Sequence, residues 1–114
     1  MTQGMADLAQ ISGMLRDRDL AAVERIIAHL NQIAADIARI EAARAARASN
    51  DAIDTARLTG MDVRWQSETE RTIRILRQRE AVLRVQHEAA LSKVRLAFGR
   101  AEVTARLAGL KPPV

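Results

Sequence analysis

The stretch of sequence on which the fold depends runs from Val23 to Arg47 and reads VERIIAHLNQIAADIARIEAARAAR. Its large apolar residues alternate in steps of three and four, which is the heptad spacing of a helix that packs along a second helix. The heptad positions are filled by Val23, Ile26, Leu30, Ile33, Ile37 and Ile40. This stretch therefore predicts a coiled-coil helix whose partner helix lies later in the same chain or in another molecule.

The composition favours a thin helical seam over a compact globule. Of the 114 residues 48% are hydrophobic, but 22 residues are alanine, and there is one Phe, one Trp and no Tyr. Compact cores depend on large apolar side chains, whereas alanine favours the helix and lets helix axes approach closely. We expect a single all-α domain, built as a long two-helix antiparallel coiled-coil hairpin.

Turn and capping residues divide the chain into two helices. We expect helix 1 at about 5–58, a turn at about 59–61, helix 2 at about 62–108 and a short C-terminal tail at 109–114. The run Ser49-Asn50-Asp51 marks a place where helix 1 could break, and Gly109 suits the end of helix 2. A corner at Gly60 would place Ile37 opposite Leu83.

The apolar pattern predicts a discontinuity near Asp17. Upstream of it, Leu8, Ile11 and Leu15 form a stripe that is out of phase with the heptads that begin at Val23. We expect the seam to start with this stripe and to re-twist or expose polar groups where the phase changes. The stripe of helix 2 is less regular, includes Glu80 and His87, and otherwise consists of Ile73, Leu76, Leu83, Leu91, Val94, Phe98, Ala101, Ala105 and Ala108.

Basic charge concentrates in the second half of the chain. Residues 1–48 contain six acids and six bases, whereas residues 61–114 contain six acids and eleven bases. Arg71, Arg74, Arg77 and Arg84 fall on one broad side of helix 2. Three interpretations stay open for these arginines: a solvated outer face, a docking strip for an acidic protein surface, and a contact for nucleic acid. Single-strand nucleic-acid binders interleave several aromatic residues with the basic ones, but here Trp65 stands alone, so nucleic acid is the least favoured partner.

Trp65 is the chain's only tryptophan and follows the expected corner by about one helical turn. It either covers the tip of the hairpin against Leu58 and Met61 or anchors a partner, because Trp and Arg are typical of interface hot spots.

The sequence contains no motif for catalysis, a metal or a cofactor. It has no Cys, no Gly-rich phosphate loop and no Glu-x-x-His pair, and we interpret His87 as a residue that flanks the seam. No apolar stretch approaches the roughly 20 residues that cross a bilayer, and the N-terminus lacks the features of a secretory signal. We expect a cytoplasmic protein without enzymatic activity, cofactor or membrane insertion.

One family shares this organisation. The pair Arg64-Trp65 opening helix 2, the Arg-dense run up to Arg84, and the segment Ala97-Phe98-Gly99-Arg100-Ala101 resemble the central stalk proteins of type III export ATPases, the FliJ/YscO family. The resemblance covers nearly the whole chain as a pattern, that of a short protein made of one long antiparallel helical hairpin. It implies a stalk or adaptor in a flagellar or type III secretion system, peripheral at the inner face of the membrane through an export complex.

The resemblance also implies partners and contact residues. The partners would be a hexameric export ATPase and export-gate or chaperone proteins. The end of the hairpin inside the ATPase ring would include Leu8, Ile11, Leu15, Phe98 and Leu107, and the contact surface nearer the corner would include Trp65, Arg71, Arg74, Arg77 and Arg84. Two alternatives remain open: a structural homodimer that forms a four-helix bundle, and a basic accessory protein that binds nucleic acid.

Overall fold

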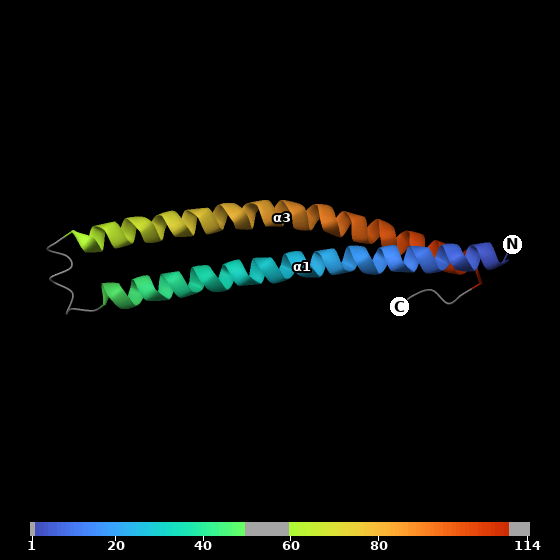
Figure 1. Ribbon diagram of the computed structural model, residues 1–114, viewed down its shortest axis with the longest axis horizontal. Coiled ribbons are helices and arrows are strands. Elements are labelled where there is room, and N and C mark those ends of the chain that lie inside the picture. Colours follow the sequence, from blue (N-terminus) through green and yellow to red (C-terminus); the bar gives the residue numbers. More distant parts are fainter. Residues whose placement is uncertain (1, 50–59, 110–114) are drawn as a thin grey trace. The chain divides into compact units, whose positions relative to one another are not determined.

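The computed structural model describes residues 2–49 and 60–109, and these form two long helices, α1 at Thr2–Ala48 and α3 at Met61–Leu107 (Figure 1). The predicted segment 52–58 of helix 1 lies outside the described residues. The fold is all-α, a two-helix antiparallel coiled-coil hairpin, as the sequence predicts. Neither described helix carries an apolar window long enough to cross a membrane.

Local hydrogen bonds account for the ends of the helices. The last turn of α1 is closed by Ser49, whose backbone N–H donates to the Ala45 carbonyl at 3.1 Å. Gly60 has a φ of 79°, and its carbonyl accepts from the Arg64 N–H at 3.2 Å in the first turn of α3. Gly109 ends α3 with a φ of 74°, a left-handed conformation that glycine adopts without strain. The predicted C-cap at Gly109 is therefore confirmed.

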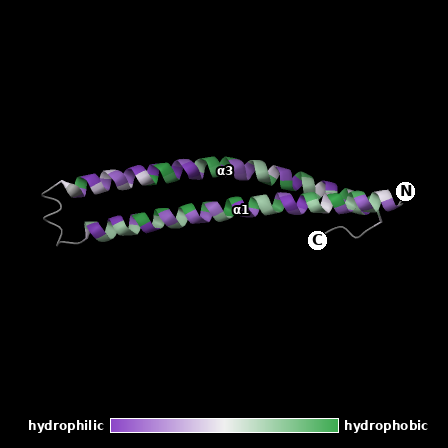
Figure 2. Ribbon diagram, in the orientation of Figure 1, coloured by the Kyte–Doolittle hydropathy of each residue, from purple (hydrophilic) through white to green (hydrophobic). Residues whose placement is uncertain are grey.

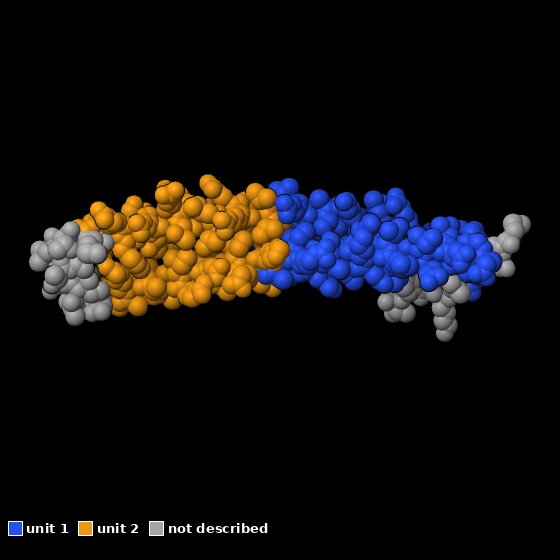
Figure 3. All heavy atoms as spheres, in the orientation of Figure 1, with its two compact units in different colours: residues 1–28, 84–114 blue, residues 29–83 orange. Residues whose placement is uncertain are grey.

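The chain divides into two compact units, each of which pairs a part of α1 with a part of α3 (Figure 3). Unit 1 comprises residues 1–28 and 84–114, and unit 2 comprises residues 29–83. Within unit 2, Arg47 contacts Asp62 at 3.0 Å and Arg44 contacts Glu70 at 3.8 Å, so the two helices run in opposite directions. Because higher residue numbers in α1 lie beside lower residue numbers in α3, the pairing is antiparallel.

The core of unit 2 is small and aliphatic. Ile33, Ile37 and Leu76 are buried, with 8%, 4% and 9% of their surface exposed, and Ile40 and Leu83 pack against them. The predicted heptad stripe is therefore confirmed in this unit. Thr69 is buried as well, and its hydroxyl donates to the Trp65 carbonyl at 2.8 Å, so its polar atom is satisfied.

The core of unit 1 is built mainly from alanine on the α3 side. Val23 of α1 is buried, and so are Ala97, Ala101 and Ala105 of α3. Side chains this small let two helix axes approach closely but remove little apolar surface from water. Figure 2 colours the residues by hydropathy. Hydrophobic and hydrophilic residues alternate along both helices without a broad apolar band.

The predicted change of phase near Asp17 is wrong. α1 is continuous, and its less exposed residues keep one heptad spacing from end to end: Met5, Ala9, Ser12, Arg16, Asp19, Val23, Ile26, Leu30, Ile33, Ile37, Ile40, Arg44 and Arg47. Leu8, Ile11 and Leu15, which we expected in the seam, are 45%, 53% and 43% exposed. The physical reason is that a helix that keeps one heptad phase needs no local change of twist, so polar side chains occupy heptad positions upstream of Val23, and Leu8, Ile11 and Leu15 face outward.

The predicted register between the helices is also shifted. A corner at Gly60 would also place Arg44 opposite Ile75, but Arg44 lies 3.8 Å from Glu70, five residues closer to the start of α3. Ile37 shares its core with both Leu76 and Leu83. The reason for the shift is that α1 ends at Ala48 and α3 begins at Met61. Each residue of α1 therefore meets an earlier residue of α3 than a corner at 59–61 predicts.

Candidate interaction surfaces

Polar contacts join the C-terminal end of α1 to the N-terminal end of α3 in unit 2. We call this group, which consists of Arg44, Arg47, Asp62, Trp65 and Glu70, the polar clasp. Arg44 and Arg47 occupy the last two heptad positions of α1, where an uninterrupted coiled coil would carry apolar residues. The Arg47 Nε lies 3.0 Å from Asp62 Oδ1, and its guanidinium carbon lies 4.4 Å from the centroid of the Trp65 ring. A cation over an indole face and beside a carboxylate is held by two attractions at once.

The surroundings of Trp65 show how much of its ring the helix pair covers. Leu58 lies outside the described residues, so the predicted packing against it is untested, but the ring is half-buried under Arg47. Trp65 also lines a hollow of about 290 Å³ together with Arg44, Arg47 and Asp62. The indole therefore contributes to the helix pair, and only part of it is open to a partner.

The arginines predicted to form a contact strip are on the surface of α3. Arg71, Arg74, Arg77 and Arg84 are all exposed. Arg77 forms an ion pair with Glu80 at 3.6 Å. Glu70, on the same helix, forms a contact across the seam, because its carboxylate lies 3.8 Å from Arg44. The strip remains a prediction as a partner site.

The residues predicted for the ATPase end all belong to unit 1 and are exposed. Leu107 is 61% exposed, and Phe98 is 38% exposed with the Arg16 guanidinium 5.5 Å from its ring centroid. On the opposite flank of the α3 seam from Phe98, Leu15 lines a hollow of about 240 Å³ with Leu96 and Ala97. The structure thus brings Leu15 beside Leu96, and it separates Phe98 from this apolar group.

Sequence reasoning missed a second apolar stripe on α3. Ile75, Val82, Leu96 and Val103 stand at multiples of seven residues from one another, and they are 39%, 57%, 59% and 54% exposed. The seven-residue spacing of these residues could have been recognised in the sequence. It is hard to see there because the position between Val82 and Leu96 is held by the small residue Ala89. Within unit 2, Ile75 and Val82 border a groove of about 620 Å³ whose other wall includes His29, Gln32 and Asp36 of α1.

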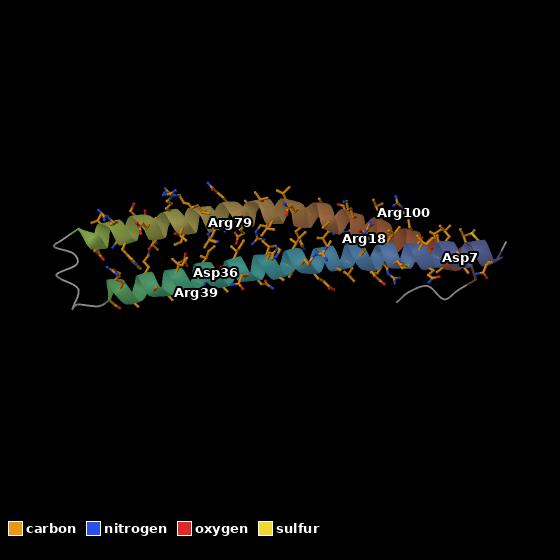
Figure 4. All side chains as sticks on the ribbon, in the orientation of Figure 1. Asp7, Arg18, Asp36, Arg39, Arg79 and Arg100 are labelled. Atoms are coloured by element: carbon orange, nitrogen blue, oxygen red, sulfur yellow. The ribbon has the colours of Figure 1, made fainter. Side chains whose placement is uncertain are left out.

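The polar wall of that groove is internally bonded. Gln32 donates to Asp36 at 3.0 Å, and Arg39 forms an ion pair with the same carboxylate. Asp36, Arg39 and Arg79 are labelled in Figure 4, where the first two lie on α1 and Arg79 on α3. His29 is exposed and His87 half-buried. Among residues 2–49 and 60–109, no three His, Cys, Asp or Glu side chains are grouped so as to hold a metal ion.

Comparisons of this chain with protein-family models, with curated proteins and with solved structures find no match.

Proposed function

We propose that this protein is a non-catalytic coiled-coil interaction protein that acts as the stalk or adaptor of a flagellar or type III secretion export ATPase. Its further partners would be export-gate or chaperone proteins, and it would work in the cytoplasm at the inner face of the membrane. The proposal combines the helical hairpin with the resemblance carried by Arg64-Trp65, the arginine run and the segment 97–101.

The observation that carries the proposal is the amount of apolar surface that the helix pair leaves open. Among the described residues, fourteen large hydrophobic side chains are exposed, whereas only seven hydrophobic residues are buried and three of these are alanine. None of the described side chains is almost completely buried. Large exposed apolar groups in an ordered helix pair are typical of surfaces that another protein covers.

The test is a binding and activity assay with a purified hexameric export ATPase from the same organism. We expect the full-length chain to co-elute with the hexamer and to raise its ATP hydrolysis rate. The double variant Ile11→Ser/Leu15→Ser should lose both effects, because it removes two exposed apolar contacts of unit 1 without opening the core. Val85→Ser is the matched control, since Val85 is 72% exposed and lies outside the residues predicted for the ATPase end.

The proposal is abandoned if the wild-type chain neither co-elutes with the ATPase nor changes its rate. If the double variant behaves like the wild type, the ATPase contact does not depend on Ile11 and Leu15, and this result would argue against the predicted ATPase end.

A further inference from the structure

The exposed side of α3 in unit 1 carries an empty hole of the coiled-coil type. Leu96, Gly99, Arg100 and Val103 are spaced i, i+3, i+4 and i+7, which is the arrangement of four residues that receives a knob from a facing helix. Together with Arg95 and Thr104 they line a hollow of about 440 Å³. No residue of α1 contributes to this hollow, so it lies outside the seam of the hairpin.

Gly99 gives the hole its depth. A glycine in a helix interior destabilises the helix relative to alanine, and such a glycine often marks a place where another backbone approaches closely. Here a Cβ built on Gly99 would meet nothing within 4 Å. The described part of this chain therefore supplies no packing reason for the missing side chain, and the space above Gly99 is open to a side chain from outside.

The rim of the hole is positively charged. Arg95 and Arg100 are exposed, and neither guanidinium forms an ion pair with another residue of the ranges 2–49 and 60–109 (Arg100 is labelled in Figure 4). An adjoining hollow shares Leu96 and Arg100 and is bordered by Lys93, and the Asp19 carboxylate on its α1 side is paired with Arg18 at 3.2 Å. The surface thus has an apolar centre and a cationic edge, the complement of an amphipathic helix whose apolar stripe is flanked by carboxylates.

We propose that the hole at Gly99 receives a large apolar side chain of an acidic amphipathic helix from a partner protein, whose carboxylates pair with Arg95 and Arg100. This inference rests on the proposed function as an interaction protein and adds the chemistry of the docking element. A second copy of the chain fits less well, because two identical faces would bring Arg95 and Arg100 against the same cations, and the chain has a net charge of +4.

The probe is a fluorescent peptide of three heptads with Leu at both apolar positions and Glu at the flanking positions, compared with its isomer that has Lys in place of Glu. By fluorescence anisotropy with the full-length chain, we expect the Glu peptide to bind at least about tenfold more tightly than the Lys peptide. Gly99→Leu should weaken the Glu peptide by about tenfold because it fills the hole. Arg95→Gln/Arg100→Gln should weaken the same peptide and reduce its sensitivity to salt.

Two controls separate the hole from general effects on folding. Gly99→Leu places a side chain in open space and should keep or raise the helicity measured by circular dichroism, so lost binding cannot come from unfolding. Val85→Ser removes a valine that is 72% exposed elsewhere on α3 and should bind the Glu peptide as the wild type does.

Equal binding of the two peptides, no binding of the Glu peptide, or unchanged binding by Gly99→Leu would each overturn the inference. Dimerisation that Gly99→Leu abolishes would assign the hole to a second copy instead, and flotation with phosphatidylserine vesicles that Gly99→Leu abolishes would assign it to a membrane surface. If the Glu peptide binds but the ATPase assay is negative, the inference that the hole receives an acidic helix stands, and only the export ATPase is excluded as the partner.

Discussion

At the scale of single residues, the least expected feature is the pair of arginines at the last two heptad positions of α1. Charged groups at such positions cost desolvation unless they find partners. Arg47 has two, the Asp62 carboxylate at 3.0 Å and the Trp65 ring at 4.4 Å, and Arg44 lies 3.8 Å from Glu70. Because both partners of Arg47 belong to α3, these contacts hold the two helices together where the apolar seam of unit 2 has ended.

Arg47→Ala is expected to destabilise the protein by about 1 kcal/mol, since it removes a cation–π contact and a partly buried ion pair. Urea unfolding monitored by the fluorescence of Trp65 measures the change, and the same tryptophan should become more accessible to iodide quenching in the folded state. Arg39→Ala is the matched control, because the ion pair of Arg39 with Asp36 lies within one helix and its loss should cost only about 0.3 kcal/mol. Equal effects of the two variants would contradict the clasp.

At the scale of the helix, the decisive property of α1 is the phase of its buried stripe. Two apolar stripes compete for the seam in its first half: one contains Leu8, Ile11 and Leu15, and the other continues the heptads of Val23. The second one faces α3, where Ala97, Ala101 and Ala105 present small side chains. Small residues on one helix tolerate the polar and bulky Arg16 and Asp19 on the other, because they leave room for these side chains to reach water.

The phase is tested by comparing two isoleucine truncations. Ile37→Ala should cost about 3 kcal/mol, because Ile37 is 4% exposed and packs in the core of unit 2. Ile11→Ala should change the free energy of unfolding by less than about 0.5 kcal/mol, because that side chain is 53% exposed. Chemical denaturation of the two variants beside the wild type provides both values. A large loss for Ile11→Ala would restore the phase that the local apolar pattern predicts.

At the scale of the whole molecule, the balance between covered and open apolar surface is what matters. A two-helix pair has one seam, so most of the surface of each helix stays in contact with water unless a partner covers it. In unit 1 the open apolar residues adjoin the exposed cations Arg95 and Arg100, and in unit 2 Ile75 and Val82 face a polar wall. Charge of one sign beside apolar groups favours a partner of opposite charge over self-association.

We therefore expect the purified chain to be a monomer at micromolar concentration. Sedimentation equilibrium at physiological salt should return a mass near 12.6 kDa, because the net charge of +4 opposes the contact of two identical cationic faces. Raising the salt concentration should be used as the control, since it screens this repulsion. A mass twice as large at low and high salt would favour the four-helix homodimer instead.

Much of the fold follows from local pattern. The heptads from Val23 to Ile40 allow only one buried stripe, Gly109 with the prolines beyond it ends α3, and the excess of alanine over large side chains indicates a seam in place of a globular core. These features could be predicted because periodicity and capping depend on residues within a few turns of one another. The seam residues Glu80 and His87 were predicted for the same reason, and both are half-buried.

The sequence alone therefore determines that α1 and α3 are helices with seams, and it favours their pairing in opposite directions within one chain. Only the tertiary structure decides which residues of the two helices meet, and hence that Leu15 lies beside Leu96. It also decides that the hollow above Gly99 lies outside the seam of the hairpin. The physical reason is that a heptad pattern repeats: sliding one helix along the other by whole turns preserves the match of the stripes, so the pattern barely distinguishes neighbouring registers. The choice among them depends on contacts between distant residues, such as Arg47 with Asp62 and Ile37 with Leu76, which no local pattern encodes.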